Sequence, residues 1–230
     1  MEEGVPLVVP EINGEDARMH HGVIANPNCS TIITMMALAP IAKISPIIAV
    51  NASTYQAVSG AGMSGIEELQ NEVEAVRTGE AVTPYVFPAQ IAYNCVAEIG
   101  SYLENGYTTE EMKMQNEGRK ILHLPALKVT CTCVRVPVYR SHSISVTFLT
   151  KEKISVKQAE EAIQNFAGDV LCSTHVPTPL ETSDQDLVYV GRIRQDLCNE
   201  NGLTLWCCGD QIRKGAAANA VEIIEYLIKK

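Results

Sequence analysis

The sequence predicts an α/β protein of the α+β kind, in which a mixed, largely antiparallel sheet has helices on one side. Four strand-like stretches in the second half of the chain are joined by hairpin-like or short connections, which favours antiparallel neighbours. Other segments of the chain have apolar residues three and four positions apart, which is the spacing of an amphipathic helix. Hydrophobic residues make up 46% of the 230 positions, which is ample for a core.

The first half of the chain contains several apolar runs and one clear helical repeat. These patterns predict short strands at 5–9 and 23–25, helices over 31–42 and 65–78, and a strand within 44–54. Pro40 and Pro46 are expected to help end the first helix, because proline lacks the amide hydrogen that a helix interior uses.

The second half begins with a segment of mixed signals, 89–102, which we expect to be irregular. Capping residues and alternation then predict helices over 109–120, 156–166 and 214–228, and strands over 129–138, 144–149, 187–194 and 203–208. The last helix is expected to bury one apolar stripe that consists of Ala216, Ala217, Ala220, Ile223, Ile224 and Leu227.

The stretch NPNCST at 26–31 lies between two apolar runs, a pattern typical of a strand, a tight turn and a helix. Asn28 or Ser30 can cap this helix, which places Cys29 at its N-terminus. Backbone N–H groups and the helix dipole favour a thiolate there and can hold an oxyanion. We therefore expect Cys29 to react with iodoacetamide at neutral pH faster than the other seven cysteines. A buried, inert cysteine is the alternative, because free cysteine often behaves as a small hydrophobe.

Together with RVPVYRSHS at 135–143, the NPNCST turn resembles the aspartate-β-semialdehyde dehydrogenase family, and the likeness covers essentially the whole chain. The resemblance implies a catalytic and dimerisation domain of the glyceraldehyde-3-phosphate-dehydrogenase-like type over 29–213. Members normally carry a nucleotide-binding Rossmann domain before the point that matches Met1, so residues 1–28 are expected to be the end of such a domain. Residues 214–230 are expected to form a C-terminal helix that packs toward it.

The family's motifs assign catalytic roles to four matching residues. By resemblance, Cys29 is the nucleophile and His142 is the general acid/base. Gln56 matches the glutamine that orients the acyl carbon, and Asn28 matches the residue that assists the oxyanion. A loop histidine without a catalytic role is the alternative for His142.

Three charged residues match the family's substrate-binding groups. Arg135 matches the arginine that clamps the substrate α-carboxylate, a planar anion that suits the guanidinium fork. Glu117 and Lys120, three residues apart on one predicted helix face, match the pair that reads the substrate amino group and the phosphate. An ordinary surface ion pair is the alternative for Glu117 and Lys120.

The glycine motif GAGMSG at 60–65 follows a strand and opens a helix, as a dinucleotide-binding fingerprint does. A five-residue gap after the strand, and a proline-containing loop after the helix, argue against that interpretation. By resemblance, Ser59, Gly60 and Gly62 form a turn near the nicotinamide end of NADP. Gln211 stands where many members have an asparagine that contacts the same end. The main NADP site is expected in the nucleotide-binding domain.

The net charge of −9 argues against nucleic acid or an anionic membrane as the main partner. Apolar runs are too short to span a membrane, and no signal peptide is visible, so we expect a cytoplasmic protein. The eight cysteines show no zinc-binding spacing. We expect reduced core cysteines and no metal, with disulfides or a metal site as the alternative.

The resemblance implies NADPH-dependent reductive dephosphorylation of L-aspartyl-4-phosphate to L-aspartate-4-semialdehyde through a Cys29 thioester, in lysine, threonine, methionine and isoleucine biosynthesis. His142 is expected to deprotonate the thiol and later to protonate the hemithioacetal. A homodimer or homotetramer assembled through the sheet is expected, and this chain alone is expected to form the acyl-enzyme without reducing it. The alternatives are a non-catalytic oligomerisation or substrate-binding domain, and an enzyme like N-acetyl-γ-glutamyl-phosphate reductase.

Overall fold

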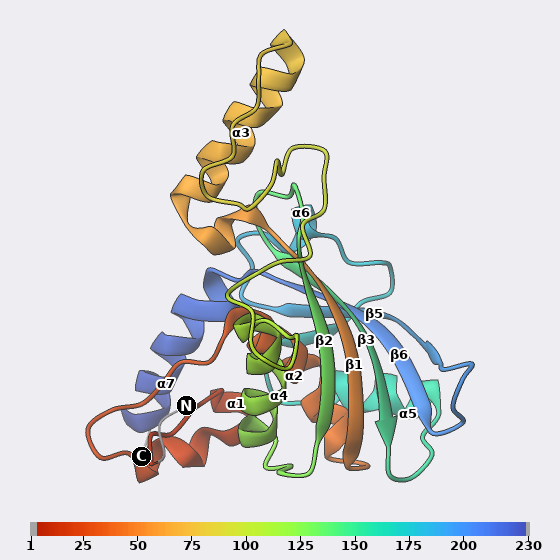
Figure 1. Cartoon of the computed structure of the whole chain (residues 1–230). Coiled ribbons are helices and arrows are strands. Elements are labelled where there is room, and N and C mark those ends of the chain that lie inside the picture. Colours follow the sequence, from red (N-terminus) through yellow and green to blue (C-terminus); the bar gives the residue numbers. More distant parts are fainter. Residues whose placement is uncertain (1–3, 229–230) are drawn as a thin grey trace.

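The computed structural model describes residues 4–228, which form one six-stranded sheet with helices packed mainly on one face (Figure 1). The strands are β1 (Ile47–Gln56), β2 (Lys128–Arg135), β3 (His142–Thr150), β4 (Val170–Cys172), β5 (Val188–Gln195) and β6 (Gly202–Gly209). Their order is β2-β1-β3-β6-β5-β4. The pairs β1–β3, β3–β6 and β5–β6 are antiparallel, whereas β1–β2 and β4–β5 are parallel. The predicted mixed, largely antiparallel sheet is confirmed.

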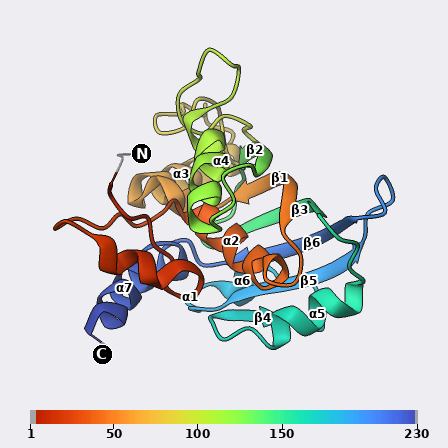
Figure 2. The same ribbon diagram turned by 90° about the horizontal axis from the view of Figure 1, so that it is seen from below.

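The α-helices are α1 (Pro10–Asn13), α2 (Cys29–Ala42), α3 (Met63–Thr78), α4 (Thr109–Ile121), α5 (Val156–Gln164), α6 (Pro179–Thr182) and α7 (Ala218–Ile228). Two short 3-10 helices, Gly14–Met19 and Val58–Ala61, and a π-helical turn, Arg213–Ala217, complete the set. Figure 2 shows α2 lying against the curved sheet with α4 and α5 at its two sides. Within 4–228, no helix is long and apolar enough to cross a membrane.

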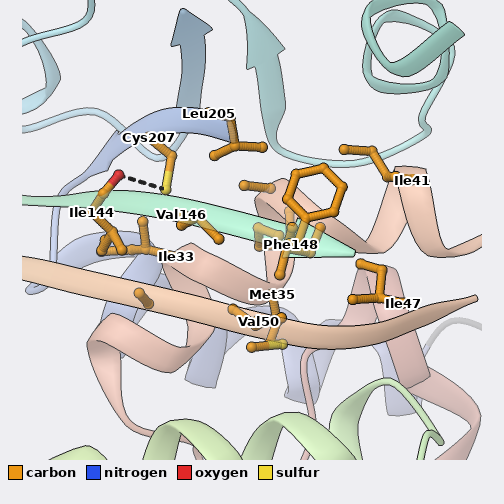
Figure 3. Close-up of a cluster of buried hydrophobic side chains, with 14 of the residues drawn as sticks. Ile33, Met35, Ile41, Ile47, Val50, Ile144, Val146, Phe148, Leu205 and Cys207 are labelled. Atoms are coloured by element: carbon orange, nitrogen blue, oxygen red, sulfur yellow. Dashed lines mark hydrogen bonds between the residues drawn. The ribbon is translucent and has the colours of Figure 1, made fainter. Parts of the chain in front are cut away.

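The hydrophobic core forms around α2, because residues 30–41 of this helix are all buried. Ile33, Met35 and Ile41 meet side chains of β1, β3 and β6 around Phe148 (Figure 3). Pro40 lies inside α2 rather than ending it, so this part of the prediction is wrong. Burial on all sides of the helix offsets the single hydrogen bond that a proline removes.

Capping residues start two helices where the sequence indicated. Thr108 accepts a hydrogen bond from the Glu111 N–H and the Glu111 carboxylate accepts one from the Thr108 N–H, which is a complete capping box before α4. Ser155 and Gln158 form the same arrangement before α5. These local signals predicted α4 and α5 correctly.

Both ends of the chain differ from the prediction. The apolar runs at 5–9 and 23–25 form only one parallel bridge, between Leu7 and Ala25, because the chain turns into α1 at Pro10. The predicted helix over 214–228 begins as a π-helical turn, which adds a residue to the turn and shifts the buried stripe. Asn219 and Ile223 are therefore buried, whereas Ile224 is 60% exposed.

The cysteines follow the expectation only in part. Cys131 and Cys133 share the buried face of β2, with their sulfur atoms 3.7 Å apart. Cys207 and Cys208 on β6 are also buried. Cys95 and Cys198 are exposed, so the prediction of a core position is wrong for these two.

Candidate active site

Cys29 is the first residue of α2, and Asn28 caps this helix. The Asn28 side-chain oxygen accepts hydrogen bonds from the N–H groups of Ser30 and Thr31, at 3.1 and 3.2 Å. These bonds satisfy two of the donors that the start of a helix leaves open. The predicted helix start is confirmed, and it places Cys29 at the N-terminus of a helix whose residues 30–41 are buried.

His142, the first residue of β3, faces Cys29. Its Nε2 atom lies 3.4 Å from Cys29 Sγ, and the residue is fully buried. The Ala57 N–H, just after β1, donates to Nδ1 over 3.0 Å. Because Nδ1 accepts this bond, the neutral ring carries its proton on Nε2, directed at the sulfur. This tautomer argues against the expectation that His142 removes the thiol proton, because the nitrogen that faces the sulfur already carries a proton.

The surroundings of Cys29 raise the pKa of its thiol. Burial, followed by the negative charge of Glu110, raises this pKa from 9.0 to about 12, although the Ser30 N–H and Arg135 act in the opposite direction. Burial, followed by the charge of Arg135, lowers the pKa of His142 to about 3. These shifts oppose the predicted thiolate, because desolvation outweighs the helix N-terminus.

Arg135 ends β2 beside this pair. Its Nη1 atom donates to the Ala57 carbonyl over 2.6 Å, and the residue is only 6% exposed. A cavity of about 390 Å³ opens next to the guanidinium and is also lined by Phe87 and Glu98. A buried positive charge in a cavity wall suits the carboxylate of a small substrate.

Glu110 is a site residue that the sequence analysis missed. Its Oε1 atom accepts hydrogen bonds from Asn28 Nδ2 at 2.8 Å and from Gln56 Nε2 at 3.2 Å. Lys113 donates to the other carboxylate oxygen over 3.2 Å. Glu110 and Lys113 have the same three-residue spacing as Glu117 and Lys120, two turns earlier on α4, and this repeat was the available signal.

The structure separates the predicted pair of Glu117 and Lys120. Glu117 accepts the Asn28 N–H over 2.8 Å, and burial raises the pKa of its carboxyl group. Lys120 instead donates to the Val5 carbonyl over 2.5 Å. On α4, Lys113 rather than Lys120 is the lysine paired with Glu110, which it meets over 3.2 Å.

The turn at 59–62 packs against the catalytic residues. A Cβ atom at Gly60 would lie 2.7 Å from Arg135 Nη1 and 3.3 Å from His142 Cε1, so only glycine fits. After this turn, α3 projects away from the sheet (Figure 1). The crossover helix of a Rossmann unit packs back on its sheet, so the glycine motif is not in the setting of a dinucleotide fingerprint.

Gln211 links the same turn to the segment before His142. Its amide nitrogen donates to Ser59 Oγ, and its amide oxygen accepts the Ser141 N–H over 2.8 Å. Gly62 has a φ of 81° and no atom near its missing side chain. The four residues predicted near the nicotinamide therefore lie together, on the His142 side of the site.

Comparison with known proteins identifies the family. Residues 38–214 match the family model of the semialdehyde dehydrogenase dimerisation domain. The aspartate-semialdehyde dehydrogenase of Aquifex aeolicus is 46% identical over 237 residues, which cover all of this chain and 70% of that protein. The chain belongs to the aspartate-semialdehyde dehydrogenase family. The Prochlorococcus marinus member is 44% identical, and the chain spans 68% of its length.

Solved structures of the family share this fold. Aspartate semialdehyde dehydrogenase II from Vibrio cholerae, complexed with ASA, superposes with a TM-score of 0.96 at 40% identity. That match covers all of this chain and 69% of the other. The Candida albicans enzyme with NADP has a TM-score of 0.71 at 23% identity, which shows the fold alone. The predicted family and fold class are confirmed.

Proposed function

We propose that this chain carries the acyl-transfer site of an NADP-dependent aspartate-semialdehyde dehydrogenase, which acts on L-aspartyl-4-phosphate. The observation that supports this most directly is the 3.4 Å contact between Cys29 Sγ and His142 Nε2 at the start of α2. A nucleophile and a proton-carrying side chain in this geometry are what acyl transfer requires. Residues 29–213 carry both groups.

Acylation uses the chain's own residues. The Cys29 sulfur attacks the acyl carbon, the S–C bond forms, the C–O bond to phosphate breaks, and the thiol proton leaves with the phosphate. His142 is neutral at physiological pH, because burial holds its pKa near 3, and it keeps a proton on Nε2 beside the reacting atoms. This proton is positioned for the oxygen of the tetrahedral intermediate. Gln56, whose Nε2 atom lies 3.5 Å from His142 Nε2, orients the acyl carbon, and Asn28 assists the oxyanion.

The charges around the pair match the substrate's three polar groups. Arg135 receives the α-carboxylate in its cavity, with part of its fork fixed on the Ala57 carbonyl. Glu110 receives the amino group, and Lys113 takes the phosphate-binding role that the sequence assigned to Lys120. Glu117 supports the nucleophile turn through the Asn28 N–H.

The nicotinamide end of NADP fits beside the turn at 59–62. Gly62 leaves open space above its backbone, and Gly60 brings the turn close to His142 without a side chain in between. Ser59, Gly60, Gly62 and Gln211 are therefore the residues that would hold this end. When bound, NADPH supplies the reducing equivalents that convert the thioester to the aldehyde.

The open face of the sheet supports assembly of a homo-oligomer. β1, β2 and β3 turn mostly small or polar side chains away from the helices, including Asn51, Ser53 and Thr132. The matching family model is a dimerisation domain that includes these strands. We propose a homodimer formed through this face.

The test is to mix the purified protein with L-aspartyl-4-phosphate and to map the products by mass spectrometry. We expect an acyl adduct on the Cys29 peptide that disappears in Cys29→Ala. A parallel sample with N-acetyl-γ-glutamyl phosphate separates the related reductase, because that reagent should leave Cys29 unmodified. No adduct from either acyl phosphate would favour a non-catalytic oligomerisation or substrate-binding domain.

A further inference from the structure

A buried ionic cluster lies outside the catalytic site. The ammonium group of Lys214 is fully buried and donates to the carboxylates of Glu11 and Glu222. It also lies 3.5 Å from Asp169 Oδ2. We call these four residues the Lys214 cluster. Its carboxylates come from α1, from the residue before β4 and from α7, so one lysine connects three separate parts of the chain.

The turn that carries Lys214 touches the nucleophile. Lys214 and Gly215 belong to the π-helical turn Arg213–Ala217. A Cβ atom at Gly215 would lie 2.9 Å from the Cβ atom of Cys29 and 3.3 Å from its Cα atom. The Gly215 backbone therefore packs directly on Cys29, and no other residue type leaves this contact unchanged.

The residues before this turn reach the other half of the catalytic pair. Asp210 is fully buried and accepts a 2.7 Å hydrogen bond from Arg140, two residues before His142. Gln211 accepts the N–H of Ser141. The segment 210–215 thus contacts Cys29 at one end and the start of β3 at the other.

From these contacts we propose that Lys214 is a positioning residue, whose buried cluster anchors the turn at 213–217 and so holds Cys29 at reacting distance from His142. The inference rests on the proposed function of Cys29. Without the ammonium group, three carboxylate groups would face one another with no counter-charge, and the turn would have to move to admit water. A small displacement of Gly215 is enough to misalign the reacting atoms.

The variant Lys214→Met tests this inference in the purified protein. Single-turnover reaction with L-aspartyl-4-phosphate, quenched and followed by mass spectrometry, gives the rate constant for acylation of Cys29. We expect that constant to fall roughly 10- to 100-fold. The half-saturating substrate concentration should not change, because Arg135 and Glu110 lie on β2 and α4. A role in stability alone would lower the amplitude, through the folded fraction, and leave the rate constant unchanged.

Arg213→Met is the matched control. Arg213 is the neighbouring cation in the same turn, but its ion pair with Asp186 is about half exposed, at 43% and 44% side-chain exposure. An exposed pair of this kind contributes little. We expect this variant to acylate Cys29 at the wild-type rate.

The rate at which iodoacetamide labels Cys29 is a second measurement, and it needs no substrate. In Lys214→Met, Cys29 should be labelled faster than in the wild type, because the displaced Gly215 no longer covers it, while buried Cys131 and Cys207 keep their rates.

If Lys214→Met does not fold, Glu222→Gln replaces it in both measurements, with smaller changes in the same directions. A wild-type protein that is never acylated would refute the proposed function. The labelling experiment would still test whether Lys214 holds the turn at 213–217 against Cys29. Unchanged acylation and unchanged Cys29 labelling in the folded variant would overturn the inference.

Discussion

The Cys29 thiol lies between backbone N–H groups that favour its thiolate and a dense, acidic environment that opposes it. Burial and Glu110 dominate, so the pKa of the thiol is raised to about 12. Arg135 acts in the opposite direction and also points into the cavity beside the pair. A cysteine held mainly as a thiol reacts slowly with electrophiles.

Labelling of Cys29 should therefore depend steeply on pH. Below a pKa of about 12 the thiolate fraction grows with pH, so the iodoacetamide rate at Cys29 should still be rising at pH 10. At pH 7, Cys29 should react more slowly than the exposed Cys95 and Cys198, which is the reverse of the sequence-based expectation. Peptide mapping of the labelled protein measures all three rates in one sample. A Cys29 rate that levels off below pH 9 would show that the thiolate forms readily.

Arg135→Lys should weaken substrate binding. Lysine has a single nitrogen atom and no planar fork, so it cannot stay on the Ala57 carbonyl and also present two parallel N–H groups to a carboxylate. The loss of one charged hydrogen bond, about 1.5–3 kcal/mol, raises the half-saturating concentration of aspartyl phosphate roughly 10- to 100-fold. The measurement is the substrate dependence of Cys29 acylation. Arg192→Lys, at an exposed position of β5, is the control, and equal values in both variants would mean that the carboxylate binds elsewhere.

Sequence reasoning found most of the site and missed one part for a clear reason. The NPNCST and RVPVYRSHS motifs placed Cys29, Asn28, Arg135 and His142, and the structure brings these residues together. Glu110 was not predicted because α4 carries a second glutamate–lysine pair, Glu117 and Lys120, two turns later. Both pairs have helical spacing, and only the packing of α4 on the nucleophile turn shows which pair faces the site.

At the scale of elements, α3 and the returning segment 79–98 form an arm held by two buried carboxylates (Figure 1). Glu68 accepts the N–H groups of Tyr85, Val86 and Phe87, and Glu72 accepts those of Ile91 and Ala92. Phe87 also lines the cavity beside Arg135. These two carboxylates therefore shape one wall of the proposed substrate site.

Glu68→Gln should loosen this arm. The amide keeps the size of the side chain, but its oxygen makes weaker hydrogen bonds than a carboxylate does. Its NH2 group would also face the backbone N–H groups of Tyr85, Val86 and Phe87, which are donors themselves. Each lost charged bond is worth about 1.5–3 kcal/mol, so limited proteolysis should cut within 79–98 much faster than in the wild type. Glu67→Gln, its exposed neighbour, is the control. Equal cleavage rates in both variants would show that the carboxylate does not hold the segment.

Elements with a strong local signal were predicted correctly, and those that depend on distant contacts were not. Capping boxes start α4 and α5, and alternation indicated β2. β4 has only three residues and exists because it pairs with β5. The π-helical turn at 213–217 has no periodic signature, because its geometry depends on contacts with Asp210 and Cys29.

At the scale of the whole molecule, the predicted parts 1–28, 29–213 and 214–230 pack together within the described residues. Val8 and Ala17 of the first part form a small core with Ile223 of α7. The Lys214 cluster adds ionic contacts between all three parts. α1 and α7 therefore lie side by side (Figure 2), and each places a carboxylate on Lys214 in the turn behind Cys29.

The sheet has one face covered by α2, α4 and α5 (Figure 2). Within residues 4–228, the other face is open over β1 and β2, whereas α6 and the segment around Pro177 cover part of it at β6. Tyr55 of β1 and Trp206 of β6 meet on the open face, with ring centres 5.4 Å apart. Ser53 lies between Thr132 and Ser145 on the neighbouring strands, so the middle of this face carries small side chains. Small residues let two such faces approach closely, as the proposed homodimer requires.

Ser53→Arg should therefore disrupt the dimer. A long charged side chain at the centre of the face must either lose its hydration or hold the two sheets apart, and the same change occurs twice in a symmetric interface. Analytical ultracentrifugation should show a shift toward the monomer mass, with the helical and sheet signals of circular dichroism unchanged. Thr78→Arg, at the exposed end of α3, is the control and should keep the mass of the wild type. If both variants keep a dimer mass, the subunits associate through a different surface, and a monomer mass for the wild type would refute the proposed homodimer.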